Sequence, residues 1–87
     1  MRLHSFTPPH PGLVLKELCL EPQGLSLREA AQVLGVSRRT LSALVRGEKP
    51  LRERLACKLA EGFGPNAESW LRQQRAYDLW VEKHPRG

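Results

Sequence analysis

Cysteines, aromatic residues and long apolar runs are scarce in this chain. Its 87 residues include two cysteines, two tryptophans and one tyrosine. Cys19 and Cys57 stand far apart, without the paired spacing of a zinc site, so we expect two reduced thiols buried among apolar neighbours. No apolar run approaches the roughly 20 residues that span a bilayer, and the opening residues lack the apolar segment of a signal peptide. We therefore expect a cytoplasmic protein with no membrane partner.

Patterns of catalytic and metal-binding residues are also missing. The three histidines, His4, His10 and His84, are scattered near the two ends of the chain, and none stands at the spacing of metal ligands. No base stands at a motif spacing from Ser26 or Ser37, and there is no glycine-rich phosphate loop. A chain of this length also buries one modest core rather than a deep cleft. The sequence therefore predicts a protein that is not an enzyme and that holds no metal and no cofactor.

Positive charge is concentrated in one segment. The chain carries 14 lysines and arginines against 9 acidic residues, a formal net charge of +5. Residues 38–58 contain seven of the basic residues and two of the acidic ones, so this segment carries the whole excess. The two acidic residues, Glu48 and Glu53, are interpreted as partners that steer neighbouring arginines rather than as catalytic acids. Positive charge focused in this way suits a polyanion such as nucleic acid.

Apolar periodicity and helix-ending residues predict an all-α fold of five helices without strands. The helices are expected at about 12–20, 27–34, 38–46, 52–62 and 67–83. His10 leads into the first helix, which Pro22 and Gly24 should end. Ser26 has capping-box spacing to Glu29 at the start of the second helix, and Asn66 is a candidate cap of the fifth.

The segment LGVSRRTLSALVRGEKP, residues 34–50, is typical of a helix–turn–helix corner followed by a basic helix. Gly35 permits a sharp turn between the two helices. Ser37 can cap a new helix, whose apolar side is formed by Leu41, Leu44 and Val45. A short helix that is anchored on one side and begins with exposed arginines has the shape to enter a DNA major groove.

The candidate DNA contacts lie on this helix and just after it. Arg38 and Arg39 can each donate two hydrogen bonds to guanine, or one of them can settle on phosphate instead. The short side chains of Ser42 and Ala43 would let the helix lie close to the bases. The predicted DNA-binding residues are Ser37, Arg38, Arg39, Thr40, Ser42, Ala43, Arg46, Lys49 and Arg52, the last three as phosphate contacts.

The last helix carries more large apolar residues than one core-facing stripe can hide. Trp70 and Leu71 are interpreted as core residues, which leaves Tyr77, Trp80 and Val81 on other sides. We favour a self-association surface over an intramolecular fold-back, because tryptophan and tyrosine are enriched at interfaces. The predicted homodimer interface is Trp70, Tyr77, Trp80 and Val81. The predicted organisation is an N-terminal arm at 1–9, a helix–turn–helix core at 10–64 and a dimerisation helix at 65–87.

Short motifs spread over roughly residues 9–80 resemble those of the HigA-type antitoxins, a branch of the Xre/Cro-like helix–turn–helix family. In chain order they are HPG at 10–12, LEPQGLS at 20–26, AQVLGV at 31–36, GEKP at 47–50, LAEGFG at 59–64 and ESWLRQQRAYDL at 68–79. Three positions depart from the family pattern, and the first of them is Leu13, which replaces a commonly charged residue. Leu27 stands where relatives often place a polar residue that touches phosphate, and Arg52 stands where they often place a capping serine or threonine.

The resemblance implies a lambda-repressor-like fold and the antitoxin of a type II toxin–antitoxin system. Such an antitoxin binds a double-stranded operator as a homodimer, represses its own operon, and neutralises a RelE-like mRNA endonuclease toxin. The toxin-binding surface stays open between the first helix with the N-terminal arm and the outer side of the fourth helix. Two other functions also stay open: a stand-alone Xre-type transcriptional regulator without a toxin, and a protein-interaction module that has lost DNA binding.

Overall fold

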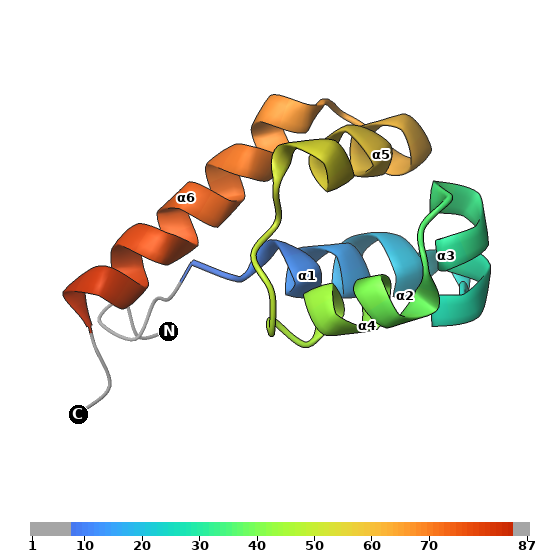
Figure 1. Ribbon diagram of the computed structural model, residues 1–87, viewed down its shortest axis with the longest axis horizontal. Coiled ribbons are helices and arrows are strands. Elements are labelled where there is room, and N and C mark those ends of the chain that lie inside the picture. Colours follow the sequence, from blue (N-terminus) through green and yellow to red (C-terminus); the bar gives the residue numbers. More distant parts are fainter. Residues whose placement is uncertain (1–7, 85–87) are drawn as a thin grey trace.

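The computed structural model describes residues 8–84, and this part of the chain folds into five helices without a strand, as predicted (Figure 1). The first helix is continuous through α1 (Pro11–Val14), a π-helical segment η2 (Leu15–Leu20) and α2 (Glu21–Gln23). It is followed by α3 (Leu27–Leu34), α4 (Arg38–Val45), α5 (Glu53–Phe63) and α6 (Ala67–Lys83). Of the predicted N-terminal arm, residues 1–7 lie outside the described part.

The first helix runs past Pro22, where the sequence predicted its end. A proline inside a regular α-helix collides with the carbonyl group four residues earlier. The wider π-helical turns before Pro22, in which the Glu21 N–H donates to the Lys16 carbonyl group, relieve that crowding. The helix ends at Gly24, the second of the two predicted ending residues, which has a left-handed conformation with φ of 67°.

Local hydrogen bonds fix the starts of the helices as the sequence predicted. The Nδ1 atom of His10 accepts from the backbone N–H of Gly12 at 3.0 Å, and Ser26 and Glu29 form a reciprocal capping box. Asn66 caps α6 by accepting from the Ser69 N–H at 2.8 Å. Helix α5, in contrast, begins without a side-chain cap at Arg52.

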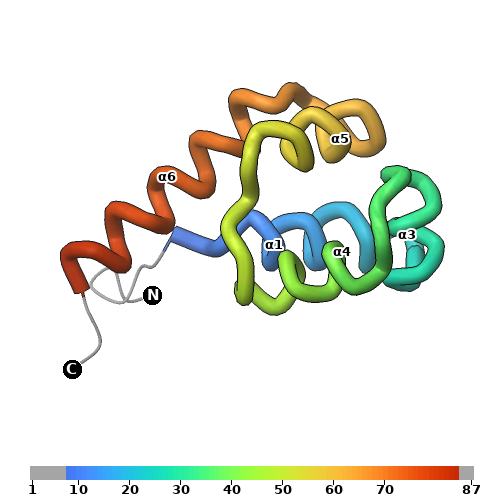
Figure 2. The backbone as a smooth tube through the Cα atoms, in the orientation of Figure 1, coloured from blue at the N-terminus to red at the C-terminus, as the bar shows by residue number. Residues whose placement is uncertain are grey.

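The core lies between the five helices and consists mainly of leucine and alanine. Helix α5 packs along the first half of α6, and the start of the first helix lies against α4 (Figure 2). Trp70 is 3% exposed, and its Nε1 atom donates to the Gly64 carbonyl group at 2.8 Å. Trp70 is therefore fixed in the core and is not available as an interface anchor, which corrects the predicted interface set. The buried hydrophobic residues are Leu15, Leu20, Ala30, Ala31, Leu34, Leu41, Leu44, Leu51, Leu55, Ala56, Leu59 and Trp70.

The two cysteines are less buried than the sequence suggested. Cys57 is exposed, because residues 55, 56 and 59 occupy the inner side of α5 and position 57 points to the opposite side. Cys19 is half-buried, and this burial raises the pKa of its thiol above the ordinary value. The expectation of a buried thiol is therefore wrong for Cys57.

The second half of α6 extends beyond the rest of the helices (Figure 1). The ring of Tyr77 meets the ring of His10 edge-on at a centroid distance of 5.0 Å, and Trp80 stacks on His84 at 4.3 Å. Leu79 and Val81 are 56% and 40% exposed. None of the helices within residues 8–84 is long and apolar enough to cross a membrane.

Candidate nucleic-acid interface

Helices α3 and α4 form the helix–turn–helix corner that the sequence predicted. Gly35 adopts a left-handed conformation with φ of 72°, and its N–H donates to the Ala31 carbonyl group at 2.9 Å. The Ser37 hydroxyl caps α4 by accepting from the Thr40 N–H at 3.1 Å. Val36 packs against the core between the two helices. These contacts fix the direction of α4 relative to α3.

The position of each α4 side chain follows from its two fully buried leucines, Leu41 and Leu44. Successive residues of an α-helix are rotated by about 100° around the axis. Arg38 therefore lies on the side of α4 next to α3, and Thr40 on the side next to α5. The side opposite the two leucines is formed by Arg39, Ser42, Ala43 and Arg46.

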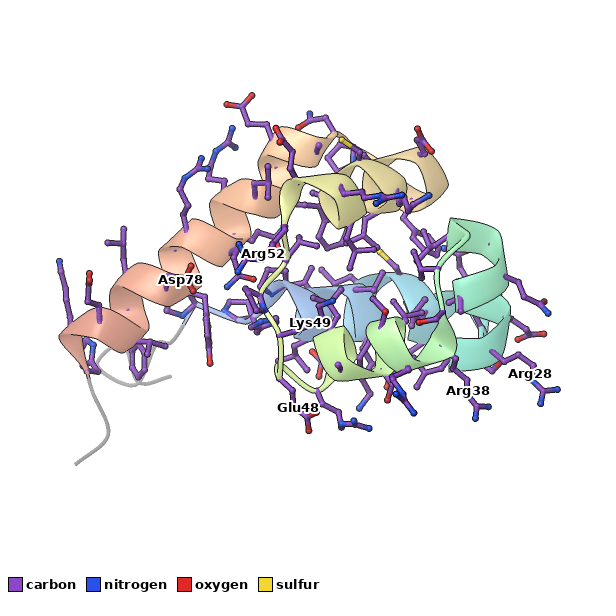
Figure 3. The ribbon with its side chains drawn as sticks, in the orientation of Figure 1. Arg28, Arg38, Glu48, Lys49, Arg52 and Asp78 are labelled. Atoms are coloured by element: carbon purple, nitrogen blue, oxygen red, sulfur yellow. The ribbon has the colours of Figure 1, made fainter. Side chains whose placement is uncertain are left out.

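A depression on the α3 side of α4 includes a residue that the sequence analysis missed. It is lined by Ser26, Leu27, Arg28, Arg38 and Ser42, so the N-termini of α3 and α4 open onto the same place. Figure 3 shows Arg28 and Arg38 extending from neighbouring helices toward the same side of the molecule. Arg28 directly follows Leu27, the position where relatives often place a polar residue that touches phosphate, and this neighbourhood is the signal for Arg28 in the sequence.

Arg46 is engaged with neighbouring side chains, in agreement with the interpretation of Glu48 as a partner of the arginines, whereas Glu53 forms no salt bridge among the described residues. Its Nε and Nη2 atoms donate to the two carboxylate oxygens of Glu48 at 3.0 and 3.2 Å, and its Nη1 atom donates to the Ser42 hydroxyl at 2.8 Å. The hydrogen bond from Arg46 lowers the pKa of Glu48, and the bond to Glu48 raises the pKa of Arg46. The positive charge of Arg46 is thus paired, although it lies on the outer side of α4.

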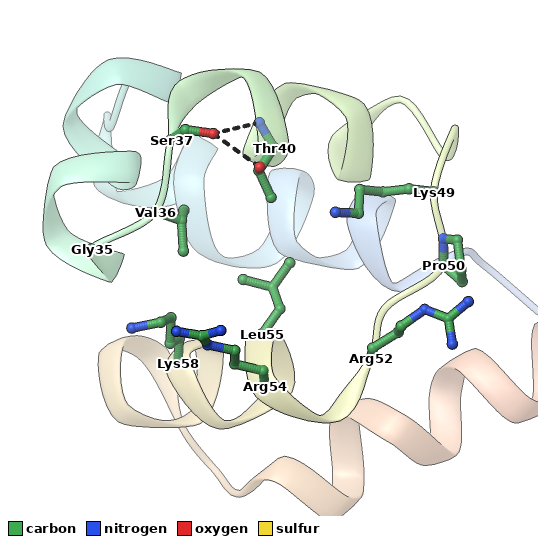
Figure 4. Close-up of a pocket in the computed structure, with 10 residues that line it drawn as sticks. All are labelled: Gly35, Val36, Ser37, Thr40, Lys49, Pro50, Arg52, Arg54, Leu55 and Lys58. Atoms are coloured by element: carbon green, nitrogen blue, oxygen red, sulfur yellow. Dashed lines mark hydrogen bonds between the residues drawn. The ribbon is translucent and has the colours of Figure 1, made fainter.

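A groove on the α5 side of α4 contains four of the other predicted residues, Ser37, Thr40, Lys49 and Arg52 (Figure 4). It has a volume of about 430 Å³ and is formed by the helix–turn–helix corner, the α4–α5 loop and the first half of α5. Arg54 and Lys58, which were not predicted as site residues, also line it. Its lining residues are Gly35, Val36, Ser37, Thr40, Lys49, Pro50, Arg52, Arg54, Leu55 and Lys58.

The predicted residues therefore surround α4 on three sides. Arg38 and Ser42 line the depression next to α3, whereas Ser37, Thr40, Lys49 and Arg52 line the groove next to α5. Arg39 and Ala43 lie on the outer side between them. Among residues 8–84 there is no group of three histidine, cysteine or carboxylate side chains that could hold a metal ion.

Comparisons with known proteins agree with this architecture. A helix–turn–helix family profile matches residues 15–71, from the π-helical segment to the first turns of α6. The chain is 42% identical over 73 residues to virulence-associated protein A of Dichelobacter nodosus, which covers 83% of this chain and 72% of that protein. It is 40% identical over 80 residues to antitoxin HigA-1 of Vibrio cholerae, which covers 92% of this chain and 75% of the antitoxin.

A solved structure of Pseudomonas aeruginosa antitoxin HigA with the higBA promoter superposes with a TM-score of 0.84 at 28% sequence identity. The superposition covers 88% of this chain and 84% of that one. It therefore extends over most of the described helices and not over the helix–turn–helix corner alone.

Proposed function

The chain belongs to the helix–turn–helix family and resembles its HigA-type antitoxins, and on this basis we propose that it is a cytoplasmic antitoxin that binds its operator DNA through α4. In this function it represses its own operon and neutralises a RelE-like mRNA endonuclease toxin. Membership of the family agrees with the prediction that the chain is not an enzyme.

The outer side of α4 carries this proposal. A B-DNA major groove is about 12 Å wide and admits one α-helix. Helix α4 is anchored by Leu41 and Leu44, and its opposite side presents Arg39 between short side chains. Within the described residues, neither Arg38 nor Arg39 forms a salt bridge. This supports a role for Arg39 as a donor to guanine, with Arg38 and Arg28 as contacts to the phosphates along one rim of the groove.

Dimerisation through the projecting half of α6 completes the proposal. Leu79 and Val81 are exposed there, and Trp80 is half-buried, so apolar side chains on more than one side of α6 are available to a second copy. A two-fold dimer would place two α4 helices about 34 Å apart, in successive major grooves on one side of the duplex. The operator should then be roughly palindromic.

Binding to the DNA upstream of the gene tests the DNA half of the proposal. Arg39→Ala should weaken binding to that duplex by about 1–3 kcal/mol, roughly 5- to 150-fold, and relax the preference at one base position. Arg75→Ala, a charge loss at an exposed position of α6, is the matched control and should bind as the unaltered protein does. If Arg39→Ala binds the upstream duplex as tightly as the control, α4 does not read the bases.

Association with the product of the neighbouring gene tests the toxin half separately. The similarity to antitoxin HigA-1 supports this part of the proposal. Co-expression should give a stable complex, and the antitoxin should restore growth to cells that express the toxin. Operator binding without such a complex would identify a stand-alone regulator.

A further inference from the structure

The groove between α4 and α5 points to a second DNA contact, and we infer that Arg54 and Lys58 bind the phosphodiester backbone there, together with Lys49 and Arg52. This inference rests on the proposed DNA binding. It adds two residues of α5 to the interface and places them on the rim of the major groove opposite the rim that faces Arg28.

The shape of the groove suits an extended anion. Figure 4 shows Lys49 and Arg52 at one end of the groove and Arg54 with Lys58 at the other, and Leu55 projects between them. Phosphates follow one another along a single DNA strand at about 3.4 Å of helix axis. A groove with cationic side chains at both ends therefore fits a run of consecutive phosphates better than one compact anion.

The charge of the groove is uncompensated. None of its lining residues is acidic, and the salt bridges among the described residues, Arg46–Glu48 and Arg72–Glu68, lie elsewhere. Like charges held near one another repel, so an anion that enters the groove relieves the repulsion of four cationic side chains. The Thr40 hydroxyl adds a neutral donor, since it accepts from Ser37 at 2.9 Å and has no acceptor of its own among the described residues.

The position of the groove favours DNA over an acidic protein segment. Thr40, on the side of α4 next to α5, lines this groove, and α4 is the helix that we place in the major groove. A helix in a major groove lies between two phosphate rims, and each flank of the helix faces one of them. The α3 flank presents Arg28 and Arg38, and the α5 flank presents this groove. The two basic depressions on opposite sides of α4 thus correspond to the two strands.

The salt dependence of binding to a random-sequence 30-base-pair duplex tests the inference. Arg54→Gln and Lys58→Gln should each reduce the slope of log affinity against log salt concentration by about 0.9, and the double variant by about twice that amount. Affinity for the upstream operator should fall by the same factor as affinity for the random duplex, because phosphate contacts carry no direct sequence information. Arg75→Gln removes the same charge from α6 and should leave the slope unchanged.

Each outcome decides the question. Unchanged slopes for Arg54→Gln and Lys58→Gln, with Arg39→Ala still defective on the operator, would overturn the inference and leave the proposed function standing. A loss confined to the operator would also overturn it, since that loss requires base contacts. If a polyglutamate peptide binds the groove and the duplex does not displace it, the occupant is an acidic protein segment. If the unaltered protein binds neither duplex, the proposed function itself is wrong.

Discussion

Gly12→Ala separates helix propensity from packing at the contact between α1 and α4. In an isolated helix, alanine is more favourable than glycine by about 1 kcal/mol. In this fold a Cβ atom on Gly12 would overlap the Leu44 carbonyl oxygen and lie 2.6 Å from the Leu44 carbonyl carbon and 2.9 Å from the Val45 Cα atom. These are backbone atoms of α4, which cannot rotate aside, so the two helices must separate.

The free energy of unfolding that Gly12→Ala loses through poorer packing should exceed the free energy that it gains through higher helix propensity. Ordinary contacts of a Cβ atom are 3.4–4 Å, so α1 must move from α4 by about 1 Å or more. Overpacking of this kind costs about 1–3 kcal/mol, and the backbone nature of the clash places Gly12→Ala toward the upper end. We expect a net loss of about 1–2 kcal/mol, and each kcal/mol lowers the Tm of a domain of this size by roughly 4–8 °C.

Thermal and urea unfolding measure the loss of stability. Gly24→Ala, with a similar expected loss but no contact between helices, is the control for operator binding. Gly24 has a positive φ of 67° and no atom within 4 Å of an added Cβ, so this variant suffers only the strain of a left-handed alanine, about 1–2 kcal/mol. At 20 °C, folded Gly12→Ala should still bind the operator less tightly, because α4 has shifted, whereas Gly24→Ala should bind normally. A Gly12→Ala protein as stable as the unaltered one would refute the close contact between α1 and α4.

Three further variants probe charge, pH and assembly. Glu48→Gln should release Arg46 and steepen the salt dependence of random-duplex binding by up to about one unit; an unchanged slope would remove Arg46 from the phosphate contacts. Burial lowers the pKa of His10 below its ordinary value of 6.5, so as the pH falls through 6.5 the unfolded chain binds the proton first and the unfolding free energy decreases. His10→Asn keeps a capping acceptor and should flatten this dependence, and a curve that still falls as steeply between pH 7 and 5.5 would assign it to another group. Trp80→Ala should convert a dimer into 9.9 kDa monomers in light scattering at micromolar concentration, and an unaltered protein that is already monomeric would end the dimer proposal.

The sequence predicted the helix boundaries well where local hydrogen bonds determine them. The caps at Ser26, Ser37 and Asn66 each join residues three positions apart, so the pattern of side chains suffices. The end of the first helix was misjudged because the π-helical segment accommodates Pro22, and a helix of changed pitch leaves no clear mark in apolar periodicity. The sequence favoured Trp70 as a core residue but did not remove it from the interface; only its burial and its hydrogen bond to Gly64 do so.

The same distinction explains what was found and missed in the candidate site. The sequence places Arg38 and Arg39 correctly at the start of an exposed helix, because Leu41 and Leu44 determine its inner side. The groove beside α4 is built from three separate segments, residues 35–40, 49–50 and 52–58. The excess of basic over acidic residues in 38–58 predicts that this surface is positively charged. It does not show that Arg54 and Lys58 face the same groove as Thr40.

Gln74 links the two surfaces that we propose for DNA and for dimerisation. Its buried Oε1 atom accepts from the Leu51 N–H at 2.8 Å, and its Nε2 atom donates to Asp78 at 2.8 Å. Leu51 lies between Lys49 and Arg52 in chain order, so α6 holds in place the loop that carries two proposed phosphate contacts. Removing α6 after Trp70 would therefore leave the buried Leu51 N–H without its acceptor and disturb the DNA interface. A loss of DNA binding in such a truncation is no measure of dimerisation, whereas Trp80→Ala leaves Gln74 and its hydrogen bonds intact.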